Sequence, residues 1–271
     1  MKKTAKILSL VLALVMVLAL CACGSQPAED TEEVAEEGET QVLTMGTNAS
    51  FPPYEYYDGD NIVGIDAEIA AAIAEKLGMQ LSIEDMDFNA IIPSITSGKI
   101  DMGMAGMTVT EERLQSVNFS TSYATGVQAI IVPEDSEITS PDDITALIEA
   151  GEDIQIGTQE ATTGYIYSSD TLENGGYGSE HVQAFKVGAD AVAALVAGKV
   201  DCVIIDNEPA KAYVAANEGL KILDSAYVTE EYAIAVALDN TELLDQINAA
   251  LEELTADGTV QSILDKYITA D

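Results

Sequence analysis

Short apolar runs alternate with helical patterns along the chain from residue 42 onward. In the segment 66–77, isoleucine or leucine recurs every fourth position, which is typical of a helix with one buried face, and Gly78 follows as a stop signal. The runs 127–132 and 201–205 are short and largely apolar, like strands buried in a sheet. Strands that alternate with helices predict an α/β fold with mostly parallel sheets.

The same pattern divides the rest of the chain into elements. The predicted strands are residues 42–45, 80–84, 100–104, 127–132, 154–157, 182–185, 201–205, 220–223 and 232–236. The predicted helices are residues 66–77, 89–97, 110–115, 163–168, 190–197, 207–217, 241–254 and 259–268, together with one that begins at Pro141. Thr110 and Ser140 stand where helix N-caps are expected, and Pro141 suits a first helical position.

Two five-residue segments a hundred positions apart are near copies. Residues 97–101 read Ser-Gly-Lys-Ile-Asp, and residues 197–201 read Ala-Gly-Lys-Val-Asp. Each combines a helix end, a glycine stop, a lysine suited to the last helical turn and the start of a strand. Such turns can arise independently, but their similar placement favours two lobes of related build.

Residues 1–22 have the pattern of a secretory signal. Basic residues precede an apolar stretch that is shorter than the roughly 20 residues a membrane-spanning helix needs. The end of this stretch, Leu20-Cys21-Ala22-Cys23, resembles the lipobox of bacterial lipoproteins, in which a small residue precedes the lipidated cysteine. Cys23 fits this motif, whereas Cys21 follows a bulky leucine. An ordinary signal with incidental cysteines is the alternative, but the motif favours a lipid anchor on Cys23.

An acidic tract, residues 23–41, follows the signal. It is rich in glutamate and has almost no large apolar side chains, so burial cannot offset the entropy of ordering it. We expect a disordered tether here. Metal binding by the acids is an alternative, although solvated acidic segments are far more common.

The overall composition excludes several functional classes. The formal net charge of −36 argues against a nucleic-acid partner, because phosphate binding requires basic patches. The single histidine, His181, lies in a polar loop, so proton shuttling and metal chemistry built on histidine are not expected. Cys202 lies in an apolar run and is expected to be buried. We therefore predict no enzyme, no cofactor and no metal.

Several motifs carry a resemblance to a known family. The segments 64–69 (GIDAEI), 97–101 (SGKID), 106–113 (GMTVTEER) and 117–120 (VNFS) resemble the polar amino acid solute-binding proteins of ABC importers, which are bacterial extracellular solute-binding proteins of family 3. The similarity extends over residues 42–266, and the segment from 106 to 120 is its most specific part.

The resemblance implies a two-lobed, periplasmic-binding-protein-like α/β fold of type II, with mostly parallel sheets and two hinge strands. Lobe 1 would comprise residues 42–122 plus 233–271, and lobe 2, with the hinges, residues 123–232. The lobes of the family close on a ligand between them, and the predicted hinges lie near 123–125 and 229–232.

Arg113 is the only arginine of the chain. A guanidinium presents a rigid fork of donors that matches a carboxylate. A surface ion pair with Glu111 or Glu112 is an alternative that the residues alone leave open. The resemblance implies instead that Arg113 binds the ligand's α-carboxylate. It also implies that Ala105, Gly106 and Thr108 donate to this carboxylate and accept a hydrogen bond from the α-ammonium.

Asp206 follows the apolar strand 201–205. A carboxylate at the carboxyl end of a parallel strand points into the crevice where α/β proteins bind ligands, although it can also cap the following helix. The resemblance implies that Asp206 binds the α-ammonium.

The remaining site residues follow from the resemblance. Phe51 and Phe88 would cover the ligand side chain, with core packing as the alternative, and Asn48 and Gln159 would face it. Thr162, Thr163 and Gly164 would open a helix whose amides bind the carboxylate. Asn48 replaces an aspartate frequent in the family, and this weakens the case for a cationic ligand. Ala161 replaces a glycine, so the loop is expected to differ locally.

The predicted function is capture of a free amino acid by hinge closure and its delivery to the permease subunits of an ABC transporter. The protein is expected to be a monomer, anchored by lipid to the outer face of the bacterial cell membrane. Asn48 and Gln159 indicate a polar, uncharged ligand, while glutamate, glutamine, cystine and basic amino acids stay open. A dehydratase-like enzyme with Glu160 as its acid is one alternative, and a ligand-sensing module is another.

Overall fold

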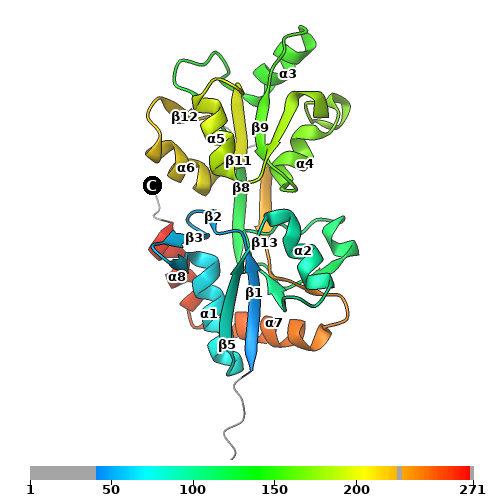
Figure 1. Ribbon diagram of the computed structural model, residues 1–271, viewed down its shortest axis with the longest axis vertical. Helices are drawn as coiled ribbons and strands as arrows, with labels where there is room; N and C mark the ends of the chain where they lie inside the picture. The colour runs from blue at the N-terminus through cyan, green and yellow to red at the C-terminus, as the bar shows by residue number, and fades with distance from the viewer. Residues whose placement is uncertain (1–40, 225–227, 269–271) are drawn as a thin grey trace, which may run out of the picture. The chain divides into compact units, whose positions relative to one another are not determined.

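The computed structural model describes residues 41–224 and 228–268, and two β-sheets form its framework (Figure 1). The predicted signal, the lipidation site Cys23 and nearly all of the predicted tether lie outside the described residues. Within the described ranges, no helix is both long enough and apolar enough to cross a membrane.

The first sheet has the strand order β5-β1-β6-β14-β7. Strands β5 (Gln80–Asp85), β1 (Val42–Thr47) and β6 (Met102–Gly103) are parallel, whereas β14 (Ala235–Ala237) pairs antiparallel with β6 and with β7 (Val117–Phe119). A late segment of the chain therefore completes a sheet that the first part begins.

Four helices pack around this sheet. They are α1 (Ile65–Leu77), α2 (Phe88–Thr96), α7 (Thr241–Ala256) and α8 (Thr259–Tyr267). In Figure 1, α1 and α2 lie on either side of β1. In the apolar stripe predicted for α1, Ile69 and Ile73 are buried and Leu77 is partly buried, and the αL conformation of Gly78 (φ 68°) ends the helix.

The second sheet has the order β10-β9-β11-β8-β12, with β13 also paired to β8. Its parallel strands are β10 (Val182–Phe185), β9 (Ile156–Gln159) and β11 (Cys202–Asp206). Strand β8 (Ala124–Pro133) runs antiparallel to β11, β12 (Leu220–Ile222) and β13 (Val228–Tyr232). Both sheets are therefore mixed, and parallel pairing is confined to three neighbouring strands in each.

The helices of the second sheet are α3 (Pro141–Glu149), α4 (Thr163–Ser169), α5 (Gly188–Val196) and α6 (Asn207–Ala216). In Figure 1, α4 and α5 lie on either side of β11. Ser140 caps α3 in a capping box with Asp143, as the Ser-Pro pair predicts. Cys202 is fully buried in β11, as expected.

Strands β8 and β13 lie where the described chain passes between the two sheets. The chain leaves the first sheet after β7 and enters β8, and it returns from β13 to β14. The two strands pair from Ala124↔Tyr232 to Gln128↔Val228. The predicted hinge segments thus lie side by side in one antiparallel ribbon.

The structure differs from the sequence prediction in several short elements. Strands β2 (Ser50–Phe51), β3 (Glu55–Asp58) and β4 (Asn61–Val63) form a small sheet that was not predicted. The helix predicted over 110–115 is a 3₁₀ turn, η1 (Arg113–Gln115), and the strand predicted over 232–236 is interrupted between β13 and β14. Further 3₁₀ turns are η2 (Leu172–Asn174) and η3 (Ser179–His181). Such short elements carry too few residues for a periodic signal.

Replacing Gly126 with alanine should destabilise the ribbon. A Cβ at Gly126 would lie 2.3 Å from the hydroxyl and Cζ atoms of Tyr232, whose side chain is fully buried. Overpacking of this kind costs about 1–3 kcal/mol, and each kcal/mol lowers the melting temperature by about 2–4 °C in a protein of this size. Thermal unfolding of Gly126→Ala, beside a Thr125→Ala control at the exposed neighbouring position, measures the effect. An unchanged melting temperature in Gly126→Ala would show that the ribbon accommodates the methyl group.

Candidate functional site

A cavity lies where strand ends of the two sheets meet. Strands β1, β6, β9 and β11 direct their carboxyl ends toward it, as expected for ligand sites in α/β folds. The lining residues come from these strand ends, from β2 and β3, from the start of α2, from η1 and the loop before it, and from the start of α4: Asn48, Phe51, Glu55, Phe88, Ala105, Gly106, Thr108, Arg113, Gln159, Thr162, Thr163 and Asp206.

The cavity brings together every predicted ligand-binding residue except Gly164, and it adds Glu55. Gly164 packs elsewhere, because a Cβ on it would lie 2.9 Å from the side-chain oxygen of Gln128 and 3.2 Å from the carbonyl oxygen of Ile204. Gly164 therefore allows α4 to approach the second sheet closely, and it is not among the residues that line the cavity.

The guanidinium of Arg113 is buried in the cavity wall, with 7% of the residue exposed. Its Nη1 donates to the carbonyl of Thr108 over 2.7 Å, and its Nη2 donates to the carbonyl of Ala161 over 3.0 Å. The guanidinium carbon also lies 5.3 Å from the ring centre of Phe88. Burial lowers the pKa of Arg113, and the opposing charge of Glu230 acts in the other direction. The alternative of a surface ion pair does not describe this residue.

The loop between β6 and η1 approaches the cavity through Gly106. Its φ of 53° lies in the left-handed region, and a Cβ there would lie 2.9 Å from the ring of Phe51. The amide of Gly106 donates to Asp66 over 2.9 Å. The loop thus places Ala105 and Thr108 in the wall, while the Gly106 amide holds a buried carboxylate.

The loop between β9 and α4 forms the facing wall. Ala161 adopts φ 61° although it is not a glycine. The expected local difference is therefore not seen in this dihedral, and alanine carries the strain of the left-handed conformation. Thr162 caps α4, accepting from the amide of Tyr165 and donating to the carbonyl of Gln159.

Asp206 is buried at the carboxyl end of β11 and accepts a hydrogen bond from the hydroxyl of Tyr232. Burial raises its pKa to about 7. It occupies the N-cap position of α6 without a side-chain capping bond, so the capping alternative is not observed.

Glu55 and Glu230 are buried carboxylates that the sequence analysis missed. Glu55 is 1% exposed on β3, burial raises its pKa well above the ordinary value, and its Oε2 has no hydrogen-bond partner. Asp66 lies beside it, and burial raises the pKa of Asp66 to about 6. Glu230 is 4% exposed on β13. Burial alternates along the segment 228–232, so that Glu230 and Tyr232 lie on one buried face of β13. This alternation was the one signal that could have identified one of the two carboxylates, Glu55 and Glu230.

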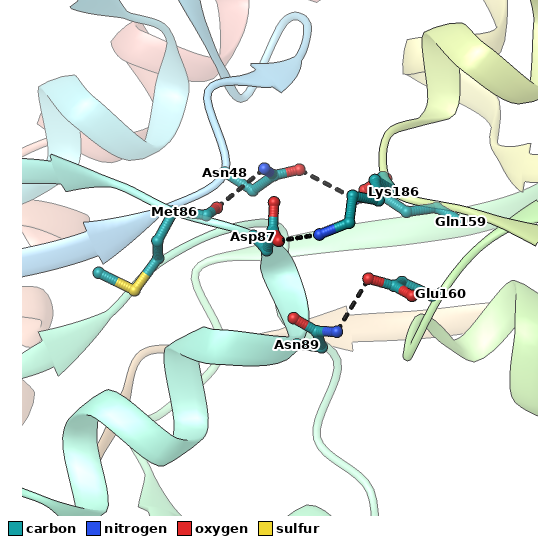
Figure 2. Close-up of polar contacts among 7 residues, drawn as sticks. All are labelled: Asn48, Met86, Asp87, Asn89, Gln159, Glu160 and Lys186. Carbon is teal, nitrogen blue, oxygen red and sulfur yellow. Dashed lines mark hydrogen bonds and ion pairs between the residues drawn. The ribbon is translucent and has the colours of Figure 1, made fainter.

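Polar contacts join the two sides at the edge of the cavity (Figure 2). Asn48 donates to the carbonyl of Met86 and accepts from Gln159 over 2.9 Å. Farther out, Lys186 pairs with Asp87, and Asn89 donates to Glu160 over 2.8 Å. Glu160, the acid considered for an enzyme, is thus a partner of Asn89 and is absent from the cavity lining.

The site can hold a small molecule that carries both charges. The guanidinium of Arg113 offers a partner for an anion, and the carboxyl group of Asp206 offers a partner for a cation. Phe51 and Phe88 supply apolar surface. In the described part of the chain, no group of three or more His, Cys, Asp or Glu side chains is placed to hold a metal ion.

Comparison with known proteins agrees with this geometry. Residues 43–270 match the model for bacterial extracellular solute-binding proteins, family 3. The arginine-binding extracellular protein ArtP of Bacillus subtilis (strain 168) is 31% identical over 268 residues, which cover 98% of this chain and 99% of the relative. Two structures of an ancestral arginine-binding protein, one bound to glutamine and one bound to arginine, are each 39% identical with a TM-score of 0.76 and cover 84% of this chain and 98% of theirs. The predicted periplasmic-binding-protein-like fold is confirmed.

The buried carboxylates predict how stability depends on pH. Asp206 titrates near pH 7 in the folded state and near pH 3.8 when unfolded, so the folded state binds the proton more tightly. Its contribution to stability should increase as the pH falls through 7 and should level off near pH 4. Between pH 7.5 and 5.5 we expect a gain on the order of 1–2 kcal/mol from this group.

Urea unfolding at the two pH values measures the gain, and Asp206→Asn isolates the part due to Asp206. The variant should gain less stability than the unchanged protein on acidification, with Asp66 supplying part of what remains. Equal gains in the two proteins would contradict the assignment to Asp206.

Proposed function

We propose that this chain, which belongs to the bacterial extracellular solute-binding proteins, family 3, holds its ligand by the two charges that every free amino acid carries. Arg113 binds the α-carboxylate, and Asp206 binds the α-ammonium. The observation that carries the proposal is that both side chains are buried in the wall of one cavity. A buried charge is costly unless an opposite charge and hydrogen bonds compensate it, and a zwitterionic ligand would supply both.

Family membership confirms the prediction of an extracellular amino-acid-binding protein of an ABC transporter. It also confirms that the function is binding and not catalysis. The partners that follow are the free amino acid and the transporter.

We further propose that the ligand has a cationic side chain, with arginine as the candidate. Several relatives carry names that describe arginine binding, among them ArtP of Bacillus subtilis. Asn48 lacks the charge of an aspartate, but the buried carboxyl group of Glu55 has an oxygen without a hydrogen-bond partner in the same cavity. Burial raises the pKa of Glu55, and a cationic ligand beside it would lower this pKa by favouring the charged form. Phe51 and Phe88 give a guanidinium flat surfaces to contact. This proposal replaces the uncharged ligand that Asn48 and Gln159 indicate in the sequence.

Closure of two lobes about the ribbon of β8 and β13 is the proposed route of capture. Lobe 1 comprises residues 42–122 plus 233–271, and lobe 2 comprises residues 123–232. Three contacts of Figure 2 support this, because the pairs Asn48–Gln159, Asp87–Lys186 and Asn89–Glu160 each join a residue of one lobe to a residue of the other at the edge of the cavity. These contacts belong to the closed form, which then docks on the permease subunits as a monomer.

A lipid anchor at the bacterial cell membrane completes the proposal. A signal over residues 1–22, lipidation of Cys23 and an acidic tether over 23–41 would hold the binding unit at the outer face. The lipobox-like sequence before Cys23 supports this location.

A thermal-shift screen of the twenty amino acids tests the ligand. Arginine should raise the melting temperature most, because a ligand at 100 times its Kd adds about 2.7 kcal/mol to the stability of the folded state. Arg113→Lys should lose most of this shift, since lysine cannot form the bidentate contact. No shift with any amino acid would overturn the proposed function. An undiminished shift in Arg113→Lys would overturn the role of the guanidinium alone.

The ion pair between Lys186 and Asp87 should slow ligand release. Lys186→Glu and Asp87→Lys should each raise the dissociation rate about two- to fivefold at low salt, the range for an exposed pair, and the double exchange should restore it. Stopped-flow release measures the rates. Lys76→Glu and Glu253→Lys, which break an exposed pair between α1 and α7, are the controls and should leave the rate unchanged. Additive effects of the Lys186 and Asp87 exchanges would exclude a direct contribution of the pair.

A further inference from the structure

Glu230 contacts a residue in each of the two facing walls of the cavity but does not itself line the cavity. Its Oε2 accepts hydrogen bonds from the hydroxyl of Thr108 over 3.1 Å, from the hydroxyl of Thr163 over 3.0 Å and from the side-chain amide of Gln128 over 3.0 Å. Thr108 belongs to the loop before η1, and Thr163 is the first residue of α4. Both threonines line the cavity, whereas Glu230 does not.

These contacts fix the direction of two hydroxyl groups. A hydroxyl has one proton to donate and two lone pairs that accept. An oxygen that accepts three hydrogen bonds uses the single protons of Thr108 and Thr163, so each hydroxyl has only lone pairs left for the cavity. Gln128 also donates to Thr163, over 3.4 Å, which strengthens this direction. The two threonines therefore face a ligand as acceptors, and acceptors suit an ammonium.

The charge of Glu230 also favours a ligand that carries an ammonium group. It is the largest favourable charge interaction of the buried Arg113, so it offsets part of the positive potential that attracts an anion. It also adds to the negative potential around Asp206. A ligand with only a carboxylate gains less from such a site than one that brings an ammonium as well.

We infer that Glu230 is a positioning and specificity-determining residue, which makes the site select ligands with an α-ammonium by holding Thr108 and Thr163 as acceptors. The inference rests on the proposed function. It assigns to the ribbon strand β13 a part in ligand choice beyond that of a connection between the lobes.

Two probes that differ only at the ammonium test this role. Arginine carries the α-ammonium, and 5-guanidinopentanoic acid has the same carboxylate and guanidinium without it. Titration calorimetry of the full chain gives both Kd values, and the ratio of the two measures selection for the ammonium. A general loosening of the cavity would weaken the binding of both probes alike and would leave the ratio of their Kd values unchanged.

Glu230→Gln removes the charge and replaces one acceptor oxygen with a donor. The ratio should fall about tenfold, which corresponds to about 1.4 kcal/mol, because arginine binds more weakly while the des-amino probe does not. Glu231→Gln is the matched control, since it removes the same charge from the exposed neighbouring position of the same strand, and it should leave the ratio unchanged. If Glu230→Gln does not fold, Thr163→Val removes one of the oriented hydroxyls and should lower the ratio in the same way.

The outcomes separate the inference from the proposed function. An unchanged ratio in the folded Glu230→Gln variant, or in Thr163→Val when that replaces it, overturns the inference while the proposed function stands. An equal fall in Glu231→Gln also overturns it, because strand charge alone would then explain the change. If neither probe binds the unchanged protein, arginine is not the ligand, and the ratio is measured with the amino acid that the thermal-shift screen identifies and its des-amino analogue. Binding of no amino acid at all overturns the proposed function, and the inference falls with it.

Discussion

The burial of a single guanidinium sets the arrangement of the site. Arg113 is nearly removed from water, and a buried charge is costly unless hydrogen bonds and opposite charge compensate it. Its two carbonyl partners, Thr108 and Ala161, come from loops that follow strands of different sheets. One side chain thus requires the two halves to come together, and the other walls of the cavity follow from that approach.

The left-handed conformation of Ala161 belongs to this constraint. A non-glycine residue in this region costs on the order of 1 kcal/mol or more and persists only where its surroundings hold it. Here its carbonyl accepts from Arg113, and the next residue, Thr162, is tied to Gln159 and caps α4. The strain at one backbone position is therefore offset by contacts that also form the cavity wall.

Much of this arrangement could be predicted from the sequence, because its motifs resemble those of a known family. The residues alone left a surface ion pair open for Arg113 and a helix cap open for Asp206, and the resemblance placed both in the site. Glu55 and Glu230 were not predicted, since each lies on a short strand among other acidic residues and only contacts with distant segments bury it. The 3₁₀ turn at Arg113 was missed for a similar reason: three residues cannot show whether the helical period continues.

Strand β13 connects the two sheets and also holds residues of the ligand site in place. Glu230 and Tyr232 are two residues apart, so their side chains lie on the same face of the strand. Glu230 accepts from Thr108 and Thr163, while Tyr232 donates to Asp206. A twist of this strand would therefore disturb the partners of the threonines and of Asp206 together. Of these contacts, only that of Thr108 would cross between the proposed lobes, because the partners in the other two contacts all lie within residues 123–232. Separation of the lobes would therefore release the hydroxyl of Thr108, while Thr163 and Asp206 would keep their partners on the ribbon.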